Sequence, residues 1–502
     1  MHFSRITSSK EPNVVGQDQI TRESISPKHD RHNGYQWTAL SVTTVGALLA
    51  SIQGSALLIA LPNILAELHI NFFTIMWVLL GYLLILTVFT PIVGRLADLW
   101  GRKLLYNSGF IAFTIGSLIC GIAQPQFHGS DLILGRVIQG LGAALLVTNS
   151  TVIVTDAFRK GQIGLGLGVN QIAGAAGFLI GPIIGGLLTE FSWRWVFLFN
   201  VPIGIFGALW GIWRLREPVL PLERQPFDWF GSFSLSIGLA GLLLGLSMLA
   251  FPILPLPVTI AIFITGIVSL IVFFAIEPRI KVPLIQLRLF RSRLFTLANL
   301  SGLFNGIARG AVLFLLIFFL QGPYGKDPLT AGLMLTPFGA AFMIIGPLSG
   351  RLSDRFGSRI LAPIGLAVSA LGLLGLTTIN QFTPYWILSL YMALMGGGSG
   401  FFVSPNTNAI MSSVEPHTRG AAAGILNMLN NTGSMLSIAI VFPLALSKIP
   451  FNAIQQVFIT GGGMGAFSSA IPPFLSGLHL AFLFSFALSV IAAIIAALRP
   501  SH

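Results

Sequence analysis

The chain alternates between long apolar segments and short polar ones. About fourteen apolar segments occur between residues 38 and 498, each close to the roughly twenty residues that cross a bilayer as a helix. The sequence therefore predicts an all-α polytopic membrane protein with about fourteen transmembrane helices. The predicted spans are residues 38–62, 72–94, 104–123, 130–154, 164–188, 195–214, 229–250, 256–276, 295–320, 329–350, 360–379, 385–412, 420–446 and 476–498.

The composition excludes several other classes of protein. Hydrophobic residues make up 54% of the 502 residues and charged residues only 9%, whereas a soluble domain carries about 25% charged residues. A soluble enzyme, a nucleic-acid-binding protein and a secreted disulfide scaffold are therefore excluded. The single cysteine, Cys120, allows no internal disulfide.

The net charge of +12 reflects membrane topology. If the N-terminus is cytoplasmic, 23 of the 28 Lys and Arg residues fall on the inner side or at the inner end of a span, three on the outer side and two deeper within spans. This asymmetry follows the positive-inside rule. We expect a plasma membrane protein, the inner membrane in a bacterium, with both termini in the cytoplasm and no nucleic acid as partner. Residues 1–37 are predicted to form a disordered cytoplasmic tail, because they are polar and lack periodicity.

A sequence motif occurs twice, at corresponding places. GRLADLWGRK (94–103) follows the second span, and GRLSDRFGSR (350–359) follows the tenth. This repetition predicts two equivalent six-helix halves, residues 38–215 and 294–502, with an inserted helix pair and its flanking segments at 216–293. Parallel repeats of this kind are typical of transporters, whose substrate site lies near the membrane midplane between the halves.

These motifs resemble the major facilitator superfamily. GRLADLWGRK is similar to its signature between helices 2 and 3, LILGRVIQGLGAA (132–144) to its helix 4 motif, and GFLIGPIIGG (177–186) to the helix 5 motif of exporters. The number of spans and the segment WRWVFLFNVPIG (193–204) resemble the fourteen-spanner drug:proton antiporter branch, the EmrB/QacA type. The resemblance implies the major facilitator fold and drug export.

The repeated motif is a candidate conformational gate. Gly94 and Gly101 allow helix ends to approach closely, and Asp98 is placed to pair with Arg102 or to face a helix N-terminus. A charged latch of this kind stabilises one state of an alternating-access cycle. The alternative is a solvated turn that only contributes to positive-inside charge. The second copy supplies Gly350 and Asp354 as the corresponding residues.

The helix 5 motif predicts close helix packing. Gly177, Gly181 and Gly185 lie four residues apart on one face, with Gly186 beside them, and Pro182 is expected to bend the span. Ordinary packing between membrane helices explains the same spacing, and the export direction comes only from the resemblance.

Two arginines within spans are candidate substrate or coupling residues. An arginine at mid-bilayer costs about 2.5–3.5 kcal/mol, so Arg309, with Asn305 one turn earlier, indicates function. The resemblance implies that Arg136 faces the cavity. The alternatives are snorkelling or pairing with Asp131 for Arg136, and capping of carbonyl groups on a neighbouring helix for Arg309.

Acidic residues are absent from the centres of the spans. The family resemblance implies an acidic residue in helix 1, and Gln53 stands at that position here. Because a glutamine cannot take up and release a proton near neutral pH, the resemblance does not decide whether transport is coupled to protons. Two arginines without a carboxylate favour a neutral, zwitterionic or anionic amphiphile over a quaternary cation.

The sequence thus predicts an exporter of amphipathic small molecules that works by alternating access in a lipid bilayer. The alternatives are a facilitator or importer of a small organic solute on the same fold, or a cationic multidrug:proton antiporter. Motifs for catalysis, metals and phosphate are missing, so we expect neither an enzyme nor a cofactor. A periplasmic adaptor is left open as a partner.

Overall fold

The computed structural model describes residues 34–68, 70, 72–159, 161–217, 227–250, 254–280, 283–326, 328–448 and 471–500. The described residues form helices and no strands, as expected where backbone polar groups must be satisfied within each segment. Fourteen of their helical spans are long and apolar enough to cross a membrane, which confirms the predicted number. Of the predicted tail, residues 1–33 lie outside the described part of the chain.

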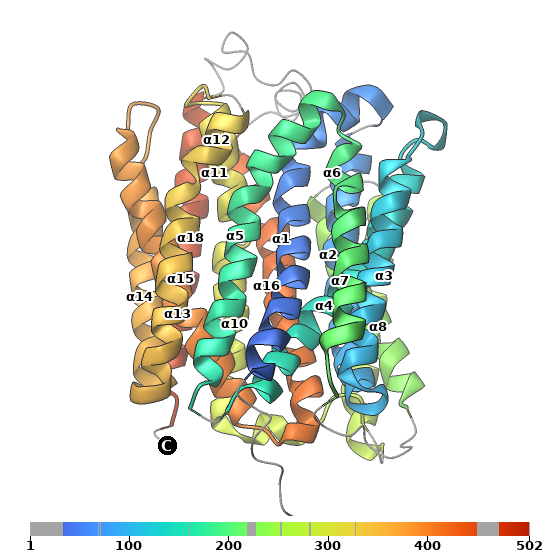
Figure 1. Ribbon diagram of the computed structural model, residues 1–502. Coiled ribbons are helices and arrows are strands. Elements are labelled where there is room, and N and C mark those ends of the chain that lie inside the picture. The colour runs from blue at the N-terminus through green and yellow to red at the C-terminus, as the bar shows by residue number, and fades with distance from the viewer. Residues whose placement is uncertain are drawn as a thin grey trace, which may run out of the picture.

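The first part of the chain forms one bundle, drawn in blue to green in Figure 1. Within it, α1 packs on α5, α3 on α4 and α7, and α2 on α4. Its helices are α1 (Tyr35–Leu68), α2 (Phe72–Trp100), α3 (Arg102–Gly121), α4 (Ser130–Ala157), α5 (Ile163–Phe191), α6 (Trp195–Leu198) and α7 (Asn200–Arg214).

The last part of the chain forms a second bundle beside the first, drawn in yellow to red (Figure 1). Here α13 and α14 pack on α15, and α18 packs on α14, α10 and α16. Its helices are α10 (Arg293–Arg309), α11 (Val312–Gln321), α12 (Pro328–Met334), α13 (Thr336–Phe356), α14 (Ser358–Leu376), α15 (Tyr385–Ser412), α16 (Arg419–Leu446) and α18 (Ile471–Ala497).

The helices α8 (Trp229–Ala250) and α9 (Leu256–Ile276) are peripheral to both bundles. They pack on each other, and α8 also touches α2 and α16. The two bundles meet where α5 packs along α13 and where α2 packs along α16. This arrangement fits the predicted division into two halves and an inserted pair, whose boundaries stay a prediction.

Three predicted spans are each interrupted by a short break. The span 195–214 divides between α6 and α7, 295–320 between α10 and α11, and 329–350 between α12 and α13. At the second break, Gly310 lies so close to α16 that an added Cβ would be 2.7 Å from the Ser434 Cα. The backbone N–H of Ala311 donates to the Ser437 hydroxyl at 2.8 Å, so α16 satisfies a donor that the interrupted helix leaves free.

The two copies of the repeated motif have the same backbone conformation. Gly101 ends α2 with φ 94°, and Gly357 ends α13 with φ 77°. Both values lie in the region that favours glycine. Gly101 therefore makes a sharp turn between helices, and the close approach that we expected of it stays a prediction. We call the end of the bundle that carries these turns the motif end; the C-terminus lies there too (Figure 1).

Candidate functional site

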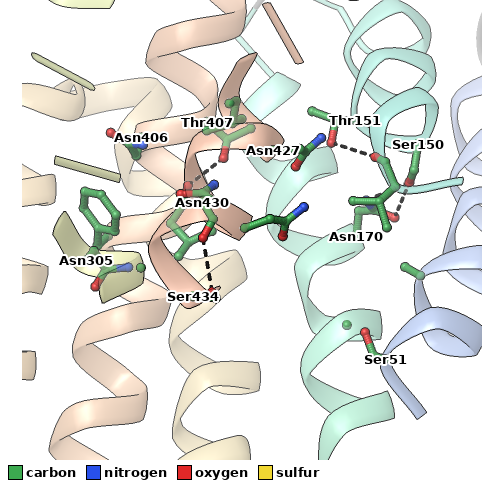
Figure 2. A pocket seen from close by; sticks show the side chains of 18 of the residues that line it. Ser51, Ser150, Thr151, Asn170, Asn305, Asn406, Thr407, Asn427, Asn430 and Ser434 are labelled. Carbon is green, nitrogen blue, oxygen red and sulfur yellow. Dashed lines mark hydrogen bonds between the residues drawn. The ribbon is translucent and has the colours of Figure 1, made fainter. Parts of the chain in front are cut away.

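A cavity of about 340 Å³ lies between the two bundles. The N-terminal bundle contributes Ser51, Ser150, Thr151 and Asn170 to its lining, and Figure 2 shows them opposite the polar groups of the C-terminal bundle. The latter are Asn305, Arg309, Asn406, Thr407, Asn427, Asn430, Asn431 and Ser434. A polar cavity between the halves is the arrangement expected of a transporter built from repeats.

A second cavity of about 330 Å³ adjoins the first and shares Ser51, Gly174, Arg309, Val403 and Ser434 with it. Its remaining lining is mostly apolar and comes from α11 and α13, with Leu313, Phe314, Phe338 and Phe342. Arg309 therefore lies between a polar compartment and an apolar one. An amphipathic molecule has the same division of polar and apolar surface.

Arg309 occupies the last position of α10, directly before the break. Its side chain is half-buried and lines both cavities. Among the described residues no hydrogen bond or ion pair holds the guanidinium group, so the capping of a neighbouring helix is not seen there. A helix C-terminus favours a cation, because the last carbonyl groups carry partial negative charge. The break in the span thus stabilises a positive charge whose donors are left for a ligand.

Asn305 also lies on α10, one turn before Arg309, and the structure brings both to the first cavity as predicted. On the opposite wall, Asn170 donates from Nδ2 to the Ser150 hydroxyl at 3.0 Å. No acidic side chain appears in the described lining of either cavity. The site therefore combines one cation with neutral donors and acceptors.

Gln53 lies outside the lining of both cavities. Its side chain is fully buried within the N-terminal bundle, and its Oε1 accepts a hydrogen bond from the Asn200 side chain of α7. A glutamine at this position thus joins α1 to α7. Its predicted contact with substrate stays a prediction.

Arg136 is also buried away from both cavities, between α2 and α4. Its Nε donates to the Val78 carbonyl at 3.0 Å and its Nη1 to the Gln139 side chain at 2.6 Å. The guanidinium carbon lies 4.1 Å from the centre of the Tyr82 ring. The side chain neither snorkels nor pairs with Asp131, because these local partners hold it inside the bundle. Its substrate role stays a prediction.

The latch residues of the first motif join the two bundles at the motif end. Both Asp98 carboxylate oxygens accept backbone N–H groups from the start of α16, Gly420 at 3.1 Å and Ala421 at 3.0 Å. Arg102 lies 3.4 Å from the same carboxylate. Both expected interactions of Asp98, with Arg102 and with a helix N-terminus, are therefore present, and a helix N-terminus favours such an anion.

Further contacts reinforce this junction. Arg102 donates to the Pro416 carbonyl at 2.8 Å and forms an ion pair with Asp156 at the end of α4. Asp156 also pairs with Arg419 of the other bundle at 2.9 Å. Sequence reasoning missed Asp156 and Arg419 as latch residues, because neither belongs to the repeated motif. Their placement at the inner ends of predicted spans was the available signal.

Glycines allow the backbones at this junction to touch. A Cβ added to Gly94 would lie 2.3 Å from the Gly420 carbonyl oxygen, and one added to Gly350 would lie 2.2 Å from the Gly164 carbonyl oxygen. The first motif copy thus meets the start of α16, and the second meets the start of α5. The Asp354 side chain lies outside the described residues.

The helix 5 glycines pack α5 against α1. Added Cβ atoms on Gly177, Gly181 and Gly185 would each lie within 3 Å of α1 atoms, whereas one added to Gly186 would lie 3.3 Å from the Leu329 Cδ1 of the other bundle. The close packing predicted from the spacing is therefore present. The Pro182 side chain lies outside the described residues.

Comparison with known proteins places the chain among transporters. The model of the Major Facilitator Superfamily matches residues 43–438 and 298–475. The riboflavin transporter RibZ of Clostridioides difficile is 30% identical over 83% of this chain and 90% of its own. Multidrug resistance protein 3 of Bacillus subtilis is 31% identical over 82% of this chain and 80% of its own.

Solved structures show the same fold. The proton:xylose symporter XylE superposes with a TM-score of 0.65, at 13% identity, over 92% of this chain and 95% of its own. At this identity the likeness concerns the arrangement of helices and not the substrate.

Proposed function

Because this chain belongs to the major facilitator superfamily and is a secondary transporter, we propose that it exports amphipathic small molecules, neutral or anionic ones above all, by alternating access. We place it in the fourteen-span EmrB/QacA-type branch and in the plasma membrane with cytoplasmic termini. The fourteen spans and the multidrug-resistance relative support this assignment.

The observation that carries the substrate class is the charge of the cavity. Arg309 is a cation without a partner in the described part of the chain, and the described lining contains no carboxylate to attract a cationic drug. In a site of low dielectric constant, a fixed cation strongly favours an anion or the negative end of a dipole. The adjoining apolar compartment accepts the rest of an amphiphile.

The latch supports alternating access. Asp98 and Asp156 join the two bundles at the motif end by direct hydrogen bonds and ion pairs. These contacts must break for the cavity to open at that end. The chain in this structure is therefore closed at the motif end, which is the cytoplasmic end by the positive-inside rule.

The test measures how much of each compound accumulates in cells of an efflux-deficient host that carries the protein, and how well these cells survive. Wild type, Arg309→Ala and Gln53→Asp are compared with amphiphiles that share one apolar body and differ only in charge, and Arg309→Lys serves as the matched control. We expect wild type and Arg309→Lys to clear anionic and neutral compounds and Arg309→Ala to lose the anionic ones. Clearance of cations alone, unchanged in Arg309→Ala, would refute the substrate class and favour a cationic multidrug:proton antiporter.

A second candidate function is the movement of a polar neutral solute, inward or down its gradient. The relative named as a riboflavin transporter favours it, as do the many amide groups of the cavity, which suit a neutral polar ligand. Gln53, which cannot carry a proton, also fits a carrier that is not driven by protons. Proteoliposome flux that ignores both pH gradient and membrane potential would select this function.

A further inference from the structure

Arg499, three residues from the end of the chain, is buried in the C-terminal bundle. Only 1% of its surface is exposed, although it follows α18 at the motif end. Its Nη2 donates to the Ser301 hydroxyl of α10 at 2.6 Å and to the Asn406 Oδ1 of α15. The chain end thus inserts a guanidinium group between two helices that line the cavity.

The charge on Arg499 is not balanced by an acid in the described residues. Its Nε and Nη1 have no hydrogen-bond partner there. Burial lowers the pKa of the guanidinium to about 10, which still leaves it positively charged at neutral pH. A buried, uncompensated charge is costly, and a purely structural tie between α10 and α15 requires none. Its position therefore points to an electrostatic role.

The contact with Asn406 fixes which end of that amide faces the cavity. An arginine can only donate, so the Asn406 atom that it meets is the oxygen. The Nδ2 group then remains for other partners, and no described residue accepts a hydrogen bond from it. Asn406 lines the first cavity together with Arg309, and Figure 2 shows it on the same side of the cavity as Asn305.

We propose that Arg499 holds Asn406 as an N–H donor and that Asn406 and Arg309 together bind the carboxylate group of an amphipathic acid. Arg499 is a positioning residue in this arrangement, since it touches Asn406 and not the ligand. The inference rests on the proposed function and makes it narrower: the preferred substrates carry a carboxylate, not merely a neutral polar group. A carboxylate only accepts hydrogen bonds, so a wall whose amide is held as a donor selects it.

The experiment measures binding to the purified full-length protein. The probes are a naphthylalkyl carboxylic acid, its primary carboxamide and the amine with the same apolar body, and the readout is the ratio of their dissociation constants. The variants are Asn406→Asp, Asn406→Leu, Arg499→Met and Arg499→Lys. Asn170→Asp serves as the matched control, because it adds the same charge to the same cavity from the opposite bundle.

We expect wild type and Arg499→Lys to prefer the acid over the carboxamide. Arg499→Met and Asn406→Leu should lower this preference about tenfold, the size expected for one hydrogen bond to a charged group. Asn406→Asp should lower it further than Asn170→Asp does, because it converts the donor into an acceptor. Thermal unfolding of each variant shows which of them fold; if Arg499→Met does not, the two Asn406 variants still test the donor role of that amide, without which the positioning role of Arg499 is refuted.

The outcomes separate this inference from the proposed function. If the acid preference is lost in Arg309→Ala but unchanged in both Asn406→Leu and Arg499→Met, the positioning role is refuted and the export of anions stands. If Asn170→Asp changes the preference as much as Asn406→Asp, only the total charge of the cavity matters, and the donor role is refuted. If wild type does not prefer the acid, the carboxylate class is refuted, while export of neutral amphiphiles is unaffected.

Discussion

Replacement of Asp98 by asparagine should release the junction at the motif end. The carboxylate accepts two backbone N–H groups of α16, at 3.1 and 3.0 Å, and lies 3.4 Å from Arg102. A hydrogen bond to a charged group contributes about 1.5–3 kcal/mol, and an anion at a helix N-terminus about 0.3–1 kcal/mol. The asparagine side chain keeps one oxygen that can accept a backbone N–H of α16, but its NH₂ group would face the other backbone N–H, and two donors cannot bond to each other. We therefore expect a loss of about 2–3 kcal/mol.

A loss of this size changes the ratio of closed to open molecules at the motif end about 30- to 150-fold. Pulsed electron–electron spin resonance measures this ratio from the distance between two spin labels. Suitable positions are Trp100 at the end of α2 and Phe356 at the end of α13, since both side chains are exposed and lie in different bundles. Cys120 is fully buried, so the labels should not attach to it.

Asp131→Asn is the matched control for this experiment. Asp131 also accepts a backbone N–H, that of Gln124 at 2.7 Å, but both residues belong to the N-terminal bundle. We expect a long-distance population in Asp98→Asn and the wild-type distribution in Asp131→Asn. Equal distributions in wild type and Asp98→Asn would mean that the carboxylate does not stabilise the closed state.

Three further predictions concern packing, titration and reactivity. Gly181→Val should destabilise the protein by about 1–3 kcal/mol, because its Cβ would lie 1.9 Å from the Ser55 hydroxyl oxygen and 2.9 Å from a backbone oxygen of α1. Gly174→Ala is the control, because its Cβ makes only an ordinary contact at 3.5 Å, and thermal unfolding compares the two variants. The hydrogen bond from Arg194 lowers the pKa of the Glu67 carboxyl. Wild type should therefore be more stable than Glu67→Gln above about pH 4.3, and this difference should disappear as the pH falls through the lowered pKa. Unfolding midpoints of both proteins across this pH range measure the difference. Cys120 should react with a maleimide only after unfolding, as mass spectrometry would show, and labelling of the folded protein would contradict its burial.

The fold was largely predictable because the bilayer imposes a simple pattern. The length and spacing of the apolar segments predicted the fourteen spans, and the repeated motif indicated the two halves. The breaks after Arg309 and before Thr336 were not predictable. The apolar run continues through each of them, and the first is set by contacts with Ser434 and Ser437 of α16, which lie more than 120 residues away in the sequence.

The candidate site was predictable in part. Arg309 and Asn305 lie at the cavity, because a charge far from either membrane surface requires a polar environment. Gln53 and Arg136 are equally unusual within spans, yet Asn200, Val78 and Gln139 hold them inside the N-terminal bundle. Sequence gives the depth of a residue in the membrane, but not which side of the helix faces the cavity when every side is largely apolar.

The two bundles divide the work of the transporter. Arg309, Asn305 and Asn406 all belong to the C-terminal bundle, which therefore supplies most of the polar lining. The N-terminal bundle contributes fewer polar side chains to the lining, namely Ser51, Ser150, Thr151 and Asn170, and its Gln53 is buried against Asn200 away from the cavity. Changes of substrate preference should therefore arise from substitutions in α10, α15 and α16, and changes in the balance between open and closed states from substitutions at the ends of α2, α4 and α16.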